Sequence, residues 1–438
     1  MLDFQKYTLD NGLDVILHED HRCPIVAVNL WYHVGSKNER PGRTGLAHLF
    51  EHLMFEGSAH HDSGFFEPLQ KAGGALNGST NCDRTNYWEV VPAEALELAL
   101  WLESDRMGHL LPALTQEKFD NQRDVVINER RQRYENRPYG MVSMALMAAL
   151  FPPAHPYHWT TIGETADLRA ATLDDARDFF ERYYHPANAS LTVAGDIDPD
   201  ATLALAQRYF SPLPTAAEPP TLTPPFDQNS FDAELGRRLL LEDRVELPRL
   251  YLAWRTPALF AAGDAGLDML AEVLSGGKTS RLYRRLVHEE RVATDVSAVQ
   301  GSRELDGWFS ITATAAPGRR LTELDEIIGE ELGRLVADGP TDDEIERGLA
   351  QVDAQFVYRL QTVGGFNGRS DQLNAYNVYT GDPGFMSRDR ARYSDSTPAA
   401  VRMLADRWLT SSGRVALSVV PEGAAADALH GSIPAVVS

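Results

Sequence analysis

Three residues in the segment GLAHLFEHLMFEGS, namely His48, Glu51 and His52, have the types and the spacing that a metal centre requires. Residues four apart lie on one face of a helix, so the two imidazoles can converge on a single ion. Imidazole nitrogen suits zinc, and two such ligands leave room for a third ligand and a water molecule. Glu51 projects to nearly the same side and can take a proton from that water. The pattern, which reverses the order of HExxH, therefore indicates metal-dependent hydrolysis.

The five-residue motif by itself also allows an interpretation without a metal ion. Three fixed residues in five arise by chance in roughly a few per cent of chains, so the motif alone is only suggestive. Two histidines on a helix face can also make ordinary polar contacts. His60 and His61 follow closely and could in principle bind metal too, but a solvated loop is the better interpretation of that pair.

The elements that must position these residues are predicted from the hydrophobic pattern. Residues 7–9 and 13–17 flank the tripeptide DNG, which is a strong signal for a β-hairpin. A strand is expected over residues 25–34, because valine and aromatic residues are frequent there. Helices with one buried stripe are expected over residues 45–55, 93–107 and 115–134.

A proline-rich passage, PLPTAAEPPTLTPPFDQNSFD, divides the chain into two nearly equal parts. Proline restricts its own φ and disfavours helix in the preceding residue, so the passage reads as an extended linker. The segments RYYHPANASLTVAGDID and RWLTSSGRVALSVVPEG echo each other near the ends of the two parts. We therefore predict a duplicated α+β domain: a catalytic domain at residues 1–212, a linker at 213–232, and a similar domain without the metal motif at 233–438.

Several segments beyond the pentapeptide resemble the pitrilysin family of metallopeptidases, which includes insulin-degrading enzyme and mitochondrial processing peptidase. These segments are NGLDVIL, WYHVGSKNERPGRTGLAHLFEHLMFEGS, GGALNGSTNCDRTNYWEVVP, FDNQRDVVINERRQRYENRPYG and HPANASLTVAGDID. They cover most of residues 5–200. The resemblance implies two similar domains, each a mostly antiparallel sheet with helices packed on one face, which together form half of a clamshell.

Matched position by position, the resemblance implies that Glu129 is the third ligand, so that His48, His52 and Glu129 would hold one zinc ion with an open position for water. Asn77 stands where the family contacts the substrate backbone, although an asparagine before glycine is equally typical of a turn. The family commonly has a glutamate seven residues before its third ligand. Here that position is Gln122, which can hydrogen-bond to a ligand but lacks the charge that raises ligand basicity.

The resemblance also implies a partner. The family has an Arg and a Tyr, seven residues apart in the second half of its catalytic unit, that reach the substrate carbonyl. In the matching stretch SRLYRRLVHEERVATDVSA those positions hold Val287 and Thr294. Arg369 and Tyr376 have the right spacing, but their surroundings do not resemble the motif. A second homologous subunit, or a further half of a longer protein, is therefore expected to supply the pair.

Composition and charge narrow the possible partners and compartments. The formal net charge of -22 argues against nucleic acid, because its phosphates would be repelled. Two cysteines cannot build a disulfide framework. No signal peptide and no uninterrupted run of about 18 apolar residues is visible. We therefore expect no membrane partner and a cytoplasmic location for the chain as written, with a periplasmic location open if it is a processed form.

These observations predict a zinc metalloendopeptidase subunit that hydrolyses unfolded peptides or small proteins in an enclosed chamber. One alternative is a non-catalytic structural core subunit descended from such a peptidase. A decayed subunit, however, has no physical reason to keep His48, Glu51, His52 and Glu129 together. The other alternative is a protease dedicated to the maturation of one precursor, which the sequence does not distinguish from a general scavenger.

Overall fold

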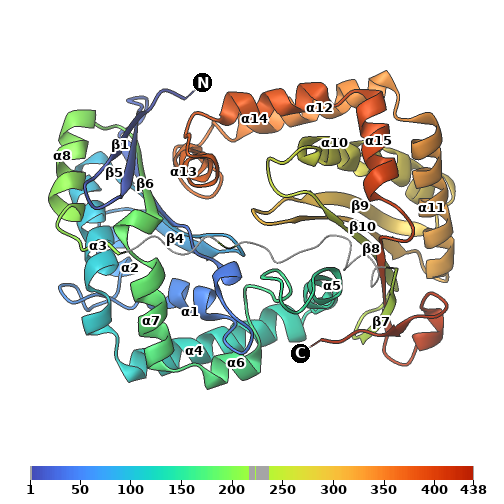
Figure 1. The fold of residues 1–438 in the computed structure, drawn as a ribbon, viewed down its shortest axis with the longest axis horizontal. Coiled ribbons are helices and arrows are strands. Elements are labelled where there is room, and N and C mark those ends of the chain that lie inside the picture. The colour runs from blue at the N-terminus through green and yellow to red at the C-terminus, as the bar shows by residue number, and fades with distance from the viewer. Residues whose placement is uncertain (1, 217–221, 223–235, 438) are drawn as a thin grey trace. The chain divides into compact units, whose positions relative to one another are not determined.

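A computed structural model of the chain describes residues 2–216, 222 and 236–437. These residues form two compact units, which are described separately below (Figure 1). The first unit takes its described residues from Met1–Arg130, Trp159–Thr223 and Phe356–Ser387, and the second from Arg131–His158, Pro224–Gln355 and Arg388–Ser438. Within the described ranges, every helix is too short or too polar to span a lipid bilayer.

The first unit is built on a six-stranded sheet. Its strands are β1 (Gln5–Thr8), β2 (Asp14–Glu19), β3 (Ile25–Tyr32), β4 (Ala75–Thr80), β5 (Thr85–Pro92) and β6 (Ala189–Gly195). They are arranged in the order β1-β2-β6-β3-β5-β4, and every neighbouring pair is antiparallel except β2 and β6. The predicted hairpin is formed by β1 and β2, and the strand predicted over residues 25–34 is β3.

The second unit repeats this plan. Its strands are β7 (Arg238–Asp243), β8 (Arg249–Thr256), β9 (Ala293–Gly301), β10 (Gly307–Ala315), β11 (Val415–Pro421) and β12 (Ile433–Pro434), in the order β12-β7-β11-β8-β10-β9. The two segments that echo each other in sequence contain β6 and β11. Each of these strands lies between one parallel and one antiparallel neighbour. The predicted α+β class with two similar, mostly antiparallel sheets is confirmed.

Helices cover the sheet of the first unit. They are α1 (Leu46–Leu53), α2 (Phe66–Lys71), α3 (Leu96–His109), α4 (Gln116–Arg130), α6 (Thr165–Ala170), α7 (Leu173–Tyr183), α8 (Pro199–Phe210) and α13 (Arg369–Thr380). An aromatic core joins α1 to α7 and the sheet: the ring of Phe50 stacks on Phe179 at 5.5 Å between centroids and lies 5.1 Å from Tyr184. Tyr184 in turn packs 4.6 Å from Tyr32 of β3.

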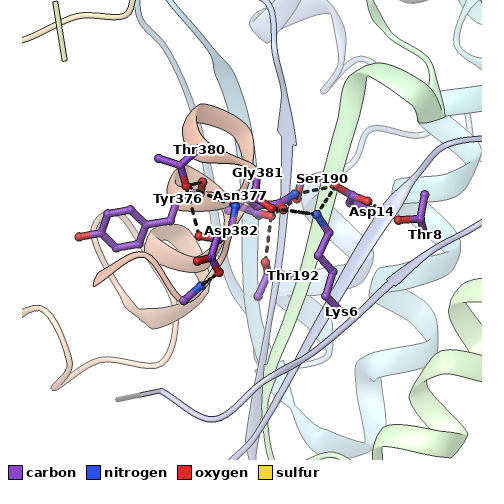
Figure 2. Close-up of polar contacts among 12 residues, drawn as sticks. Lys6, Thr8, Asp14, Ser190, Thr192, Tyr376, Asn377, Thr380, Gly381 and Asp382 are labelled. Carbon is purple, nitrogen blue, oxygen red and sulfur yellow. Dashed lines mark hydrogen bonds and ion pairs between the residues drawn. The ribbon is translucent and has the colours of Figure 1, made fainter. Parts of the chain in front are cut away.

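Helix α13 comes from the second half of the sequence but packs on β3 and β6 of the first unit. Side chains alternate along a strand, and Asn29, which is an odd number of positions from the core residue Tyr32, points to the opposite face. There the side-chain amide of Asn374 donates to the backbone oxygen of Asn29 at 2.8 Å. Figure 2 shows the neighbouring contacts of Asn377, whose side chain meets Lys6 at 2.6 Å and Ser190 at 2.9 Å. Polar side chains therefore attach α13 to the second face of this sheet.

The remaining helices supply most of their residues to the second unit. They are α5 (Val142–Leu150), α10 (Asp264–Ser275), α11 (Leu321–Asp338), α12 (Asp342–Tyr358), α14 (Met386–Arg392) and α15 (Pro398–Trp408). Two segments, η4 (Arg131–Glu135) and η7 (Tyr283–Glu289), are π-helical.

The two compact units differ from the predicted division into residues 1–212 and 233–438. Residues 131–158 belong to the second unit, and residues 356–387 belong to the first. Each part of the sequence thus gives a segment to the other unit, and a division at the linker alone misses this exchange. Most of the predicted linker, residues 213–232, lies outside the described residues.

Candidate active site

Helix α1 presents the predicted metal-binding pair. It begins after Gly45, whose φ of 89° lies in the left-handed region that favours glycine. The helix buries Leu49, Phe50 and Leu53 completely, because these residues recur at the spacing of one helix face. This fixes the rotation of α1, and its histidine-bearing face packs against α4.

The structure brings His48, His52 and Glu129 together. Glu129 lies near the end of α4, with its Oε1 atom 3.8 Å from Nε2 of His48 and its Oε2 atom 3.4 Å from Nε2 of His52. One potential ligand atom from each of the three residues lies within 4.8 Å of the other two. Tetrahedral zinc with bonds of about 2.1 Å holds its ligand atoms about 3.4 Å apart. The donor set and its spacing therefore fit a zinc ion.

Gln122, a partly buried residue of α4, supports this arrangement. Its side-chain oxygen lies 3.2 Å from Nδ1 of His52, and its amide nitrogen donates to the carboxylate of Glu56. Because an amide oxygen can only accept, Nδ1 of His52 carries the proton in this contact. The Nε2 atom, which faces Glu129, is then left with its lone pair for a metal ion.

Glu51 has the electrostatic character of a general base. Burial raises the pKa of its carboxyl, and the negative charge of Glu129 adds to this effect. The hydroxyl of Thr80 and the positive charges of His52 and Arg84 act in the opposite direction. A carboxylate whose pKa is raised above its usual range is a better proton acceptor than an exposed one. Thr80 and Arg84, from β4 and the turn after it, were not identified from the sequence.

His52 is also perturbed. Burial alone would lower the pKa of its imidazole, but hydrogen bonding to Glu129 and the charge of Glu51 outweigh burial and raise it. A ligand must lose its proton before it binds a metal ion, so metal binding at this centre depends on pH.

The two ends of α1 are held by buried polar side chains that were not identified from the sequence. At the N-terminal end, the carboxylate of Glu39 accepts hydrogen bonds from the backbone N–H groups of Gly45 at 3.0 Å and Ala47 at 2.8 Å. Burial raises the pKa of Glu39 to about 8, against the effect of these two donors. Glu39 lies six residues before Gly45, outside the positions where a helix cap is expected, so no capping pattern marks it in the sequence.

At the C-terminal end, the guanidinium of Arg106 lies 3.5 Å from the backbone oxygen of Met54. Arg106 is fully buried, bonds Glu103 at 2.9 Å and covers the ring of Phe65 at 3.7 Å. Burial and the charge of Glu103 raise the pKa of the nearby Glu89 well above its usual range. The cluster is therefore an Arg106–Glu103 ion pair with Glu89 beside it, and it packs against the C-terminal end of the metal-binding helix.

The remaining predicted positions lie as follows. Asn77 is an exposed residue of the edge strand β4, not of a turn, and its side-chain oxygen accepts from Gly78 N at 2.8 Å. Val287 lies in η7 and Thr294 in β9. Arg369 is buried in the first unit and pairs with Asp20 at 2.6 Å. The surroundings of Arg369 are those of an ion pair that secures α13.

Comparisons with known proteins agree with this fold. The family described as Insulinase (Peptidase family M16) matches residues 14–156, and the family described as Peptidase M16 inactive domain matches residues 170–352. The chain belongs to peptidase family M16. It is 31% identical to the zinc protease PqqE of Helicobacter pylori over 362 residues, which are 82% of this chain and 80% of that protein.

Solved structures of related proteins have the same fold. The crystal structure of a protease from Helicobacter pylori superimposes with a TM-score of 0.87 at 26% identity and covers 96% of this chain and 100% of that one. The structure of pitrilysin, at 21% identity, has a TM-score of 0.78 and shares the fold over 96% of this chain but 45% of its own. The resemblance to the pitrilysin family that the sequence predicts is thus confirmed, and related proteins carry the name zinc protease.

Proposed function

We propose that this chain is the zinc-binding subunit of an M16 endopeptidase. The observation that carries the proposal is the convergence of His48, His52 and Glu129, with Glu51 beside them but not among the three ligands. Two imidazoles and one carboxylate make up the ligand set of a catalytic zinc, which keeps one position open, and differ from the sulfur-rich sets of structural sites.

The residues divide the chemistry among themselves. A zinc ion bound at this centre supplies Lewis-acid chemistry, because it acidifies water and polarises a peptide carbonyl. Glu51 takes the proton of the attacking water, for which its raised pKa suits it, and passes that proton to the leaving amine. Gln122 keeps the ring of His52 in the orientation and tautomer that coordination needs.

The edge strand β4 is the proposed substrate-binding element. It pairs with β5 on one side only within the described sheet, and it packs against α1. An extended peptide can add to such an edge through main-chain hydrogen bonds, with loose demands on its sequence. Asn77, exposed on β4, is the residue that would contact the substrate backbone. Unfolded peptides and small proteins are therefore the substrate class that we propose.

A partner is part of the proposal. The positions that match the family's Arg and Tyr hold Val287, which has no donor, and Thr294, whose hydroxyl is bonded to Asp295 at 3.0 Å. Arg369 has the required charge but is committed to Asp20. We therefore propose that a second homologous subunit or half supplies the Arg/Tyr pair and completes an enclosed chamber.

The test is cleavage of an unstructured fluorogenic peptide by the zinc-loaded chain, alone and with a candidate partner that carries the Arg/Tyr pair. Glu51→Gln should bind zinc but lower turnover by about 100-fold or more, because the proton acceptor is gone. Glu67→Gln, which changes an exposed glutamate on α2, is the matched control and should leave turnover unchanged. Cleavage by Glu51→Gln at the wild-type rate would refute the mechanism, and full activity of the monomeric chain would refute the need for a partner.

A non-catalytic role is the alternative that this experiment also addresses, and the description of one matching family as an inactive domain gives it a basis. That match covers residues 170–352, which include none of the four proposed centre residues. A zinc-loaded complex that cleaves no peptide, with Glu51 intact, would favour this alternative. A dedicated maturation protease would cut one peptide in a mixed digest, whereas a general endopeptidase would cut many.

A further inference from the structure

A second group of metal-binding side chains lies in the first unit, away from the three residues described above. It consists of His60, Asp105 and His109, each of which offers one possible ligand atom within 4.8 Å of the others. His60 lies in the loop that follows α1, and the other two lie near the C-terminal end of α3. The sequence alone favoured a solvated loop for His60. It did not indicate this group, because the side chains that surround His60 come from a helix that is distant in sequence.

The geometry of α3 accounts for two of the three residues of this group. Asp105 and His109 stand four residues apart, so they share one helix face, as His48 and His52 do on α1. The rings of His60 and His109 are 4.9 Å apart between centroids and nearly perpendicular, at 85°. His60 Nδ1 lies 2.5 Å from Oδ1 of Asp105. Two imidazoles and a carboxylate thus converge from two elements.

The group is fixed on one side and open on the other. Asp105 is 3% exposed, and its second oxygen accepts from the hydroxyl of Ser58. The backbone N–H of Ala59 donates to the backbone oxygen of His109 at 2.9 Å, which holds the loop against the end of α3. The side chain of His60, by contrast, is 61% exposed. An ion can therefore reach the group from solvent and complete its coordination with water.

We propose that His60, Asp105 and His109 form a second, peripheral site for a divalent cation of the zinc class. Imidazole nitrogen with a carboxylate suits Zn²⁺, and also Ni²⁺ and Cu²⁺, better than it suits Ca²⁺ or Mg²⁺, which prefer oxygen. The ion takes the place of the proton between His60 and Asp105, and the exposed ring of His60 turns to accept it. Bound there, the ion ties the loop after the metal-binding helix to α3.

Counting zinc equivalents tests this site separately from the proposed catalytic one. The full-length chain, stripped with a chelator, is titrated with Zn²⁺ by calorimetry and by equilibrium dialysis. We expect two equivalents for the wild type, one for His60→Ala, one for His52→Ala, and none for the double variant. His61→Ala is the matched control: its ring packs near Trp101 instead of the group, and two equivalents should remain.

A second measurement keeps the test independent of folding. Zn²⁺ should raise the melting temperature of His52→Ala by several degrees, because an ion that binds only the folded state stabilises it, and this rise should vanish in the double variant. An unchanged zinc count in His60→Ala, or no thermal shift in His52→Ala, would overturn the peripheral site. The three residues would then only hold the loop against α3 through hydrogen bonds. Failure of the catalytic centre would appear differently, as an unchanged count in His52→Ala.

Discussion

The Nε2 atom of His52 lies 3.4 Å from Oε2 of Glu129, although the two residues belong to different helices, α1 and α4. Neither helix forms the centre alone, so the metal site depends on how these helices pack. The buried stripe of α1, together with Glu39 at its N-terminal end and Arg106 at its C-terminal end, fixes one side of this contact. Gln122 fixes the other side, because it reaches from α4 to the ring of His52.

Replacement of Gln122 should change zinc affinity. Gln122→Ala removes the acceptor behind His52 Nδ1 and should weaken zinc binding by about 10- to 100-fold. Gln122→Glu adds a charge, but it also places a second carboxylate against Glu56, so its full benefit should appear only with Glu56→Gln. Competition with a zinc-binding dye measures the order of affinities. Equal affinities for Gln122→Ala and the wild type would show that this contact does not support the ligand.

Removal of the Asn374 side chain should destabilise the first unit. Asn374 is fully buried, and its amide oxygen accepts from Ser190 at 2.7 Å and from Thr192 at 2.9 Å. Asn374→Ala leaves these groups buried without their partner, which should cost about 3 kcal/mol. Chemical denaturation measures the loss. Asn121→Ala, at an exposed helical site, is the control, and a loss no larger than that of the control would contradict the polar attachment of α13.

Asp268 should make stability depend on pH. Burial raises the pKa of this carboxyl to about 7, against a hydrogen bond from the hydroxyl of Tyr393 at 2.7 Å. Between about pH 4 and about pH 7 the unfolded chain has lost this proton and the folded chain has kept it, so stability falls as pH rises. The contribution is fully present below about pH 4 and is lost above about pH 7.

Denaturant midpoints at about pH 5 and about pH 8 test this dependence. The wild type should lose on the order of 2 kcal/mol more than Asp268→Asn over this interval, because the variant has no proton to release. Asp343→Asn, at an exposed position, should keep the wild-type dependence. If Asp268→Asn shows the same loss as the wild type, Asp268 does not hold its proton in the folded state.

Local signals made much of the first unit predictable. The DNG turn between two apolar runs gave the β1–β2 hairpin, and the spacing of Leu49 and Leu53 gave the buried face of α1. The resemblance to a known family implied Glu129 as the partner of the two histidines, and the structure has these residues within reach of one ion. The helix predicted over residues 115–134 changes at Arg130 from the α form to the π form.

Contacts between distant segments were not predictable from local patterns. Helix α13 joins the first unit through Asn374 and Asn377, and polar residues of this kind carry no hydrophobic periodicity that would predict burial. Arg106 looks in sequence like an ordinary charged helix residue, but it is buried behind α1. His60 meets Asp105 only because the loop folds back on α3.

The most direct test of the metal centre compares zinc affinity in Glu129→Gln and Glu51→Gln, both in the His60→Ala background so that only this centre is counted. A ligand and a neighbouring base respond differently to the loss of charge. We predict that Glu51→Gln binds one equivalent with an affinity within a few-fold of its parent, whereas Glu129→Gln binds at least about 100-fold more weakly. Undiminished zinc affinity in Glu129→Gln would contradict the assignment of this residue as a ligand, and with it the proposed hydrolytic mechanism.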